Sequence, residues 1–398
     1  MSTAAGMPAN YDEGLVGDYV LPPLSLDGAR ATAADPEEAR TAQRAWRRVF
    51  AEGLFGELPP PPTRLAWERH PLAEGDCERI AIRLEADERQ FQVNAALWLP
   101  PHRTGPVPIV IGLDFLGPVG SLQGEEFPLD PDARVALPQW LGGGQGSLAE
   151  VLRGTAAHRF PVSLLTDAGY AVLTSCYGSW VPDDPVTSRE HGVRPLLDLY
   201  DPQTAPGTVC LWSWSLLRLV DIAAQLQDVD ASAIVVAGHS RLGKAALWAS
   251  VNDERISALF LNESGCGGAS LSRRNFGESF AHNRQAFPHW LLSEDRATRA
   301  GLDNVDQHQL LALMAPRRLY VASAADDLWC DPRGEYLGLK AAAPFWSAFG
   351  IPSEFAEEPA FTPGSQVKAG ALGWHLREGG HELTPYDWTR FMRFMEAK

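Results

Sequence analysis

The stretch that decides the fold is Ala233–Ser250, AIVVAGHSRLGKAALWAS. It runs from a short apolar segment, through a turn around Gly238 and Ser240, into a helical pattern. A serine on a sharp strand-to-helix turn needs small neighbours and exposes its hydroxyl at the carboxyl edge of a sheet. The adjoining helix N-terminus supplies N–H donors for an oxyanion. Ser240 is therefore a candidate nucleophile, although the usual GxSxG pattern has glycine where this chain has Leu242, with Gly243 one residue later.

Further short apolar runs along the chain have the composition of strands buried on both faces. They are VPIVIGL at 107–113, AVLTS at 171–175, ALFLN at 258–262 and LYVASA at 319–324. Helical patterns are predicted at about 36–52, 216–227, 242–251, 344–349 and 385–396. Alternating strands and helices predict a mostly parallel central sheet with helices on both faces, a three-layer sandwich.

An antiparallel hairpin precedes the parallel strands. Its strands are Ile80–Leu84 and Val93–Leu99, both alternating in polarity and joined by a long turn. A leading hairpin followed by parallel strands indicates an α/β-hydrolase fold. We assign residues 1–75 to an N-terminal extension that wraps the core, and residues 76–398 to a single catalytic domain. The Gly- and Pro-rich segment at about 117–160 is interpreted as an insertion over one face.

The composition excludes several classes of protein. Hydrophobic residues make up 45% and charged residues 21% of the 398 residues, as in a packed globular chain. The 34 basic and 50 acidic residues give a net charge of −16 with no basic run, so neither nucleic acid nor a membrane is an expected partner. We expect a monomer. The first sixteen residues lack the basic and apolar regions of a signal peptide, and the compartment stays open. Five scattered cysteines without a CxxC pair argue against a zinc site or a disulfide scaffold, and leave one bridge open.

A serine nucleophile needs a base, and His381 is the best candidate among the ten histidines. It follows a strand-like stretch at 371–376 and precedes the last predicted helix. The chain order of serine, acid and then histidine is the order in this class of hydrolase. His239 adjoins the serine and is predicted to pack, and His289 and His308 are predicted to be structural.

The base in turn needs a carboxylate to orient it. Glu263 follows the strand ending at Asn262, and Asp327 follows the strand ending at Ala324. Both strands are predicted to end at the edge of the sheet where active sites form. Either carboxylate could reach the histidine, and the sequence leaves the choice open.

Several motifs in order resemble the glucuronoyl esterases, carbohydrate esterase family 15, and are most similar to their bacterial branch. The motifs are GHSRLGKAALWA at the turn, NESGCGG from Asn262, SRRNFGE from Ser272, FPHW from Phe287, DQH from Asp306, APRRLYVASA from Ala315, DLWCDPRGE from Asp327 and GWHLREGGHELTPYDW from Gly373. The resemblance covers about residue 229 to the C-terminus.

The resemblance implies an α/β-hydrolase that needs no metal or other cofactor. It implies hydrolysis of the ester between the 4-O-methyl-glucuronic acid of glucuronoxylan and a lignin alcohol, so that fragments of lignin–carbohydrate complexes are the expected partners. The implied roles are nucleophile for Ser240, base for His381, acid for Glu263 or Asp327, oxyanion support for Arg241, and binding of the uronate for Lys244, Glu278 and Trp329.

Two positions depart from the family pattern. His239 stands where the fungal branch has a disulfide-bonded cysteine, so that bridge cannot form here. Asp114 stands where an asparagine is expected, which leaves the contribution of that loop to the oxyanion site open. The alternatives to a glucuronoyl esterase are a general carboxylesterase acting on small esters and a non-catalytic carbohydrate-binding relative.

Overall fold

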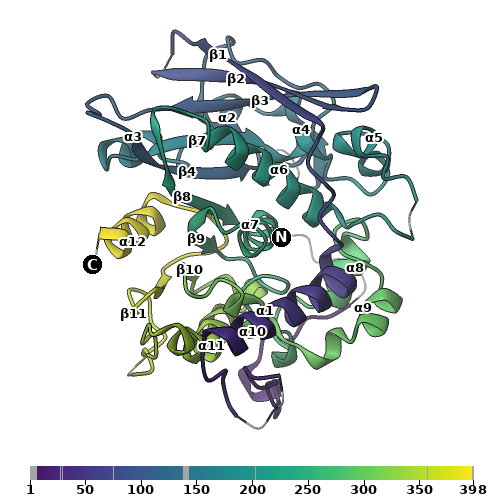
Figure 1. Cartoon of the computed structure of the whole chain (residues 1–398), viewed down its shortest axis with the longest axis vertical. Helices are drawn as coiled ribbons and strands as arrows, with labels where there is room; N and C mark the ends of the chain where they lie inside the picture. The colour runs from purple at the N-terminus through teal and green to yellow at the C-terminus, as the bar shows by residue number, and fades with distance from the viewer. Residues whose placement is uncertain are drawn as a thin grey trace.

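The computed structural model describes residues 7–26, 28, 30–74, 76–137, 143–201, 203–355 and 357–396. A ten-stranded sheet runs through the molecule in the order β1-β2-β3-β7-β4-β8-β9-β10-β12-β11 (Figure 1). Strands β7, β4, β8, β9, β10 and β12 are parallel, while β1, β2, β3 and β11 pair antiparallel with their neighbours. The mostly parallel α/β-hydrolase sheet predicted from the sequence is confirmed.

The strands are β1 Arg64–Pro71, β2 Cys77–Ala86, β3 Arg89–Trp98, β4 Val107–Asp114, β5 Arg134–Ala136, β6 Gln145–Ser147, β7 Ala171–Cys176, β8 Val229–His239, β9 Ile256–Asn262, β10 Arg318–Ala324, β11 Gln366–Ala369 and β12 Leu372–Arg377. The α-helices are α1 Pro36–Phe50, α2 Pro118–Ser121, α3 Val162–Asp167, α4 Tyr177–Trp180, α5 Val193–Leu197, α6 Thr208–Ala223, α7 Arg241–Val251, α8 Phe280–Ala286, α9 Glu294–Ala300, α10 Gln307–Ala312, α11 Pro332–Ala342 and α12 Pro385–Glu396.

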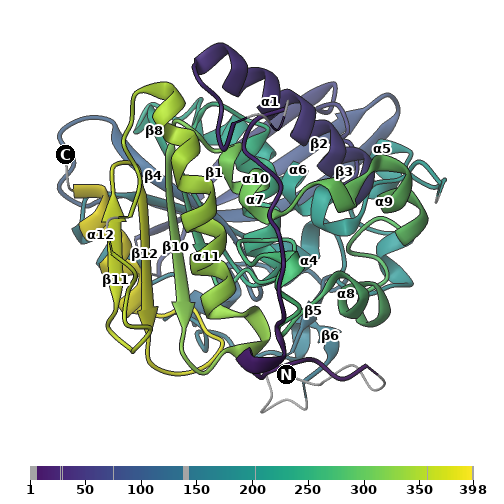
Figure 2. The ribbon, with the colours of Figure 1, turned by 90° about the horizontal axis from the view of Figure 1, so that it is seen from below.

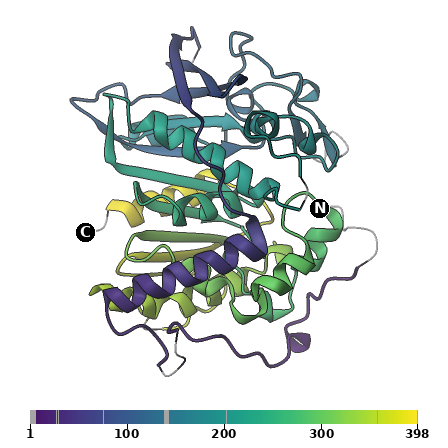
Figure 3. The ribbon, with the colours of Figure 1, turned by 45° about the vertical axis from the view of Figure 1, so that its right-hand side comes forward.

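Helices cover both faces of the sheet. Strand β12 shows the alternation: a Cβ at Gly373 would lie 2.9 Å from Phe394 of α12, whereas the ring of Trp374 packs 5.0 Å from that of Tyr336 of α11. Figure 2 shows α12 and α11 on opposite sides of the strands, and Figure 3 shows α1 crossing the outside of the layer that contains α11. The core between these layers is apolar and aromatic. No helix among the described residues is long and apolar enough to cross a membrane.

The N-terminal region differs in part from the prediction. Helix α1 begins as expected, with Asp35 accepting hydrogen bonds from the N–H groups of Glu37 and Glu38. Strand β1, however, lies within the stretch assigned to an extension and forms an edge of the central sheet. It was missed because its side chains are mixed and only half-buried, so they lack the alternation of polarity that marks a strand. The boundary at residue 75 therefore cuts through the sheet.

Three predicted elements need correction. The hairpin turn between β2 and β3 is short, comprising only Asp87 and Glu88, and Asp87 takes the positive φ of 54° that tight hairpins use. Helix α6 begins eight residues before the predicted 216, because its first turns are buried on every side and have no polar face to mark them. The predicted helix at 344–349 is a 3₁₀ segment, Ala343–Phe349.

The carboxyl ends of the parallel strands meet at one edge. Figure 2 shows β10 and β12 pointing toward the edge where the small β5–β6 sheet, α8 and the beginning of the described chain lie. The β5–β6 pair belongs to the segment interpreted as an insertion, and the N–H of Asp183 donates to the carbonyl of Arg134 in β5. Candidate residues from five strand ends are thereby gathered at this edge.

Candidate active site

Ser240 lies at a sharp turn between β8 and α7. Its backbone has φ 57° and ψ −129°, a conformation that a residue with a side chain adopts only at a cost. A Cβ on Gly238 would lie 2.2 Å from the Leu242 carbonyl oxygen, and one on Gly243 would lie 2.8 Å from Ser264 Cβ. Only glycine fits at both positions, which explains why this turn has its second glycine at 243 rather than at 242.

Neighbouring strands bring the other candidate residues to the same edge. The Ser240 N–H donates to the carbonyl of Asn262, the last residue of β9, at 2.9 Å. Glu263 therefore begins beside the turn, with a strained φ of 48° of its own. Asp327 follows β10 and His381 follows β12, the next two strands in the sheet.

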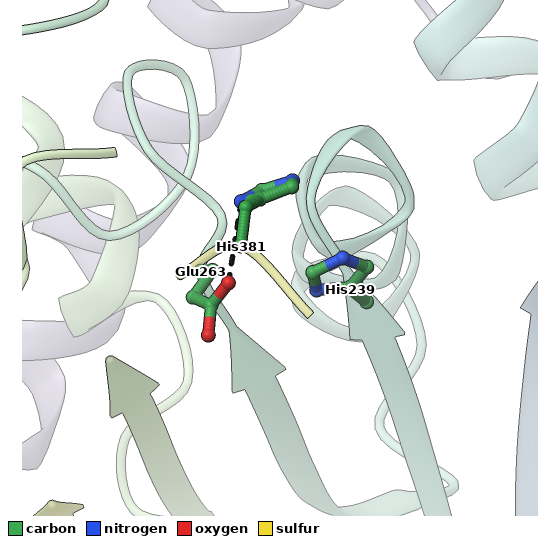
Figure 4. A group of neighbouring side chains, drawn as sticks. All are labelled: His239, Glu263 and His381. Atoms are coloured by element: carbon green, nitrogen blue, oxygen red, sulfur yellow. Dashed lines mark ion pairs between the residues drawn. The ribbon is translucent and has the colours of Figure 1, made fainter. Parts of the chain in front are cut away.

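Two carboxylates converge on His381. Its Nδ1 lies 2.6 Å from Asp327 Oδ2 and 3.2 Å from Glu263 Oε2, and Figure 4 shows Glu263 directed at the ring. Glu263 also accepts hydrogen bonds from Arg377 Nη2 at 2.5 Å and from the Glu382 N–H at 2.8 Å. Asp327 thus makes the shorter bond to the imidazole, while Glu263 divides its charge among several donors. Nε2 of His381 has no hydrogen-bond partner in the part of the chain that the structure describes.

Burial and charge shift all three groups. Burial lowers the pKa of His381, but the hydrogen bonds that its ring donates to Asp327 and Glu263 outweigh burial and raise the pKa to about 9. Burial raises the pKa of Asp327, but the hydrogen bond with His381 outweighs it, so the net shift is downward. At Glu263 burial dominates and raises the pKa of the carboxyl above its usual range, despite His381 and Arg377. Asp327 is therefore the better-stabilised anion beside the imidazole.

Arg241 is the first residue of α7 and adjoins the turn. Its Nη1 donates to Asp183 Oδ2 at 2.5 Å, and its guanidinium carbon lies 4.4 Å from the ring centroid of Trp290. Its Nε is buried and donates no hydrogen bond to any described residue. Its Nη2 also has no described hydrogen-bond partner, since only Nη1 bonds Asp183. A buried N–H donor without a partner is costly unless a ligand satisfies it. The donor set beside Ser240 can therefore serve an anion.

His239 packs beside His381. The rings of His239 and His381 are 4.5 Å apart, and His239 Nδ1 lies 2.5 Å from Asn262 Oδ1. Burial lowers the pKa of His239 well below its usual range, so the ring is neutral. His239, Glu263 and His381 have ligand atoms within 4.8 Å of one another, as do Asp327, Cys330 and His381. Both sets share the imidazole, whose Nδ1 already bonds carboxylates.

The three residues predicted to hold a sugar also come together. Lys244 Nζ donates to Glu278 Oε2 at 2.8 Å and to the carbonyl of Ser264 at 2.7 Å. The Glu278 N–H donates to the carbonyl of Trp329 at 2.7 Å. Lys244 and Glu278 are buried and pair with each other, whereas Trp329 is half-exposed, its ring 5.3 Å from that of His282. Trp329 therefore offers more surface to a ligand than the charged pair does.

Comparison with known proteins identifies the family. Carbohydrate esterase MZ0003, from an unknown prokaryotic organism, is 32% identical over 97% of this chain and 91% of its own length. The chain belongs to the glucuronoyl esterases, carbohydrate esterase family 15. The sequence model of fungal glucuronyl esterases matches residues 156–350 of this esterase. The 4-O-methyl-glucuronoyl methylesterase of Phanerochaete carnosa is 29% identical over 46% of the esterase, which spans about half (48%) of that relative's length.

Solved structures agree with this assignment. A promiscuous CE15 esterase from a marine bacterial metagenome superposes with a TM-score of 0.83 and 30% identity, covering 97% of this esterase and 99% of that chain. The glucuronoyl esterase from Solibacter usitatus gives a TM-score of 0.81 and 31% identity over 96% and 98%. The esterase is a carboxylic ester hydrolase with the fold predicted from its sequence.

The structure shows the state of the five cysteines of the esterase. All five are buried and free. His239, the residue immediately before Ser240, offers no thiol for a bridge. The bridge that the cysteine count left open is absent as well.

Two residues of the site were missed at the sequence level. Asp183, in the segment after α4, is fully buried and bonds Arg241. Arg377, the last residue of β12, donates hydrogen bonds to Glu263 and to the carbonyls of Glu378 and Gly380, which precede His381. The sequence shows Asp183 in an acidic doublet after the strand at 171–175, and Arg377 at the end of a strand. No local pattern links either residue to its partner, which lies more than fifty residues away.

Proposed function

We propose that the esterase hydrolyses esters of glucuronic acid, including 4-O-methyl-glucuronoyl esters of glucuronoxylan fragments with lignin alcohols, through a serine acyl-enzyme. The observation that carries this proposal is the bond of 2.6 Å between Asp327 and His381 Nδ1, which leaves Nε2 without a described partner in a ring that lies 4.5 Å from that of His239, the residue before Ser240. This is the arrangement in which an imidazole accepts a proton from a serine hydroxyl. Relatives named 4-O-methyl-glucuronoyl methylesterases support the substrate class.

In the proposed reaction, Ser240 Oγ attacks the ester carbonyl and His381 Nε2 accepts its proton. Asp327 orients the imidazole and stabilises its positive charge, and Glu263 assists while anchoring the loop through Arg377. The Arg241 guanidinium and the N-terminus of α7 stabilise the tetrahedral oxyanion. The alcohol leaves with the proton from His381. In the second half of the reaction, His381 accepts a proton from water, the resulting hydroxide attacks the acyl carbon, and Ser240 leaves with that proton as the glucuronate is released.

Substrate selection is proposed to involve Trp329, Lys244 and Glu278. An aromatic face suits the apolar side of a sugar ring, and a buried ion pair suits hydroxyl groups because each charge can bond one oxygen. Because the pair is buried and already satisfied internally, its proposed contact with the sugar is smaller than that of Trp329.

A second candidate function is general hydrolysis of small esters. It is favoured by the marine relative, which is described as promiscuous. The test measures hydrolysis of benzyl glucuronate beside para-nitrophenyl acetate, with Ser240→Ala as the blank for each. A higher kcat/KM for the glucuronate, lost in the variant, supports the uronate assignment. A preference for the acetate that is also lost in the variant supports the general esterase instead.

A further inference from the structure

Arg241 is held by a carboxylate that stands outside the proposed triad. Asp183 is fully buried, and each of its oxygens accepts two hydrogen bonds. Oδ2 accepts from Arg241 Nη1 at 2.5 Å and from the Tyr177 hydroxyl at 2.7 Å. Oδ1 accepts from His289 Nε2 at 2.9 Å and from Trp290 Nε1 at 2.8 Å. Four donors on one buried carboxylate fix its position in both rotation and translation.

Aromatic rings, one of them from the same set, also pack around the guanidinium. The Arg241 guanidinium carbon lies 4.4 Å from the ring centroid of Trp290, 5.1 Å from that of Phe287 and 5.5 Å from that of Phe115. Trp290 therefore stacks on the arginine while its N–H bonds the carboxylate that the arginine bonds. In this position Nη1 bonds Asp183, and Nε and Nη2 are left without described partners.

The network reaches into the segment interpreted as an insertion. The hydroxyl of Tyr177 accepts a hydrogen bond from the Ala136 N–H of β5 at 2.8 Å, and the Asp183 N–H donates to the Arg134 carbonyl at 3.0 Å. Asp183 is thus anchored by its backbone to β5 and by its side chain to α7. The orientation of the arginine depends on how this segment packs.

We propose that Asp183 is a positioning residue, which holds the Arg241 guanidinium in the orientation that stabilises the oxyanion. The inference rests on the proposed function of Arg241. A donor that is fixed before the reaction costs no reorganisation when charge develops, and that is the main source of electrostatic catalysis. Without Asp183, the guanidinium would keep its stacking partners but lose the bond that sets its rotation, and Glu278 would be the other carboxylate whose charge attracts it.

The test is a double-mutant cycle on kcat with benzyl glucuronate. Arg241→Ala is expected to lower kcat by about 100- to 1000-fold, as loss of one oxyanion donor does. Asp183→Asn is expected to lower kcat by about 10- to 100-fold with little change in KM, because the hydrogen bond lost is to a charged group. In the Arg241→Ala background, Asp183→Asn is expected to cost less than about threefold, since the group it positions is gone.

The matched control is Asp306→Asn. Asp306 is equally buried and accepts hydrogen bonds from the backbone of Ser272 and Gln307, but it does not bond Arg241. Its variant should leave kcat within about threefold in both backgrounds once the folded fraction is measured by thermal unfolding. An equal loss from Asp183→Asn in both backgrounds, or a loss no larger than that of the control, would overturn the proposal.

A second variant covers the case in which Asp183→Asn does not fold. Tyr177→Phe removes the other donor to Oδ2 and leaves the Arg241–Asp183 pair in place. We expect a kcat loss of about two- to tenfold that disappears in the Arg241→Ala background; a loss that persists there contradicts the proposal. If Arg241→Ala leaves kcat unchanged while Ser240→Ala abolishes activity, the positioning proposal fails but the proposed serine esterase function does not. If Ser240→Ala stays active, the proposed function fails.

Discussion

The two ends of the parallel strands differ in their chemistry. At the amino ends of β4 and β8, an open groove of about 780 Å³ is lined by Trp67, Arg69, Arg103 and Asp228 among others. Arg69 bonds Glu78 and Asp228, and Arg103 also bonds Asp228, so the charges neutralise one another. At the carboxyl ends, Arg241 Nε and His381 Nε2 have no described partner, and the backbone at Ser240 and Glu263 is strained.

A large volume therefore does not by itself mark a reactive site in this esterase. A protein keeps strain and unpaired donors only where the surrounding structure compensates for their cost, and such features gather at functional sites. The groove is spacious and contains charged side chains, but each has its partner. At the carboxyl edge, by contrast, Arg241 Nε is buried without a described partner.

The largest expected effect tests whether the carboxyl edge is the reactive one. Ser240→Ala should lower kcat by about a million-fold, the scale for loss of a triad nucleophile, while leaving the fold intact. Steady-state hydrolysis of benzyl glucuronate measures it, with circular dichroism to verify folding. A loss of less than tenfold would move the chemistry away from this edge.

The next effect distinguishes the two carboxylates. Asp327→Asn should lower kcat by about 10⁴-fold, because the neutral side chain neither fixes the tautomer of His381 nor stabilises its charge. Glu263→Gln should cost about 10- to 100-fold, because its bond to His381 is longer and part of its charge is used by Arg377. Similar small losses in both single variants, with collapse only in the double variant, would instead mean that the two share one role.

The pH dependence of the esterase sharpens the assignment further. His381 must be neutral to accept a proton, and its pKa is raised to about 9. The kcat/KM of the free enzyme should therefore rise with pH up to about 9 and then level off. Because Asp327 raises that pKa, Asp327→Asn should shift the rise in kcat/KM to lower pH and lower the plateau value of kcat/KM. If the rise in kcat/KM stays at the same pH in the variant, a group other than His381 controls it.

The smallest effect concerns the opposite edge. Asp228→Asn should leave kcat and KM unchanged, because the groove lies at the other end of the strands. Its ion pairs are partly exposed, so the free energy of unfolding should fall by no more than about 1 kcal/mol. Chemical denaturation and the glucuronate assay measure the two quantities. A change in KM would indicate that the groove contacts substrate.

Much of this arrangement was predictable from local patterns. Apolar runs of five to seven residues marked the central strands, because strands buried on both faces exclude polar side chains. The turn at Ser240 was marked by glycines that have no room for a Cβ. Strand β1 was not predictable, because a half-buried edge strand tolerates charged residues on both sides.

The sequence by itself determined the central parallel strands, the sharp turn at Ser240 and the candidate residues Glu263, Asp327 and His381 at the strand ends, because periodicity and glycine placement encode burial and backbone shape locally. The tertiary structure alone decided that Asp327 is nearer than Glu263 to His381, and that Asp183 holds Arg241. Those outcomes depend on distances of a few tenths of an ångström between side chains more than fifty residues apart. Such distances follow from how loops pack on one another, which no local pattern of residues records.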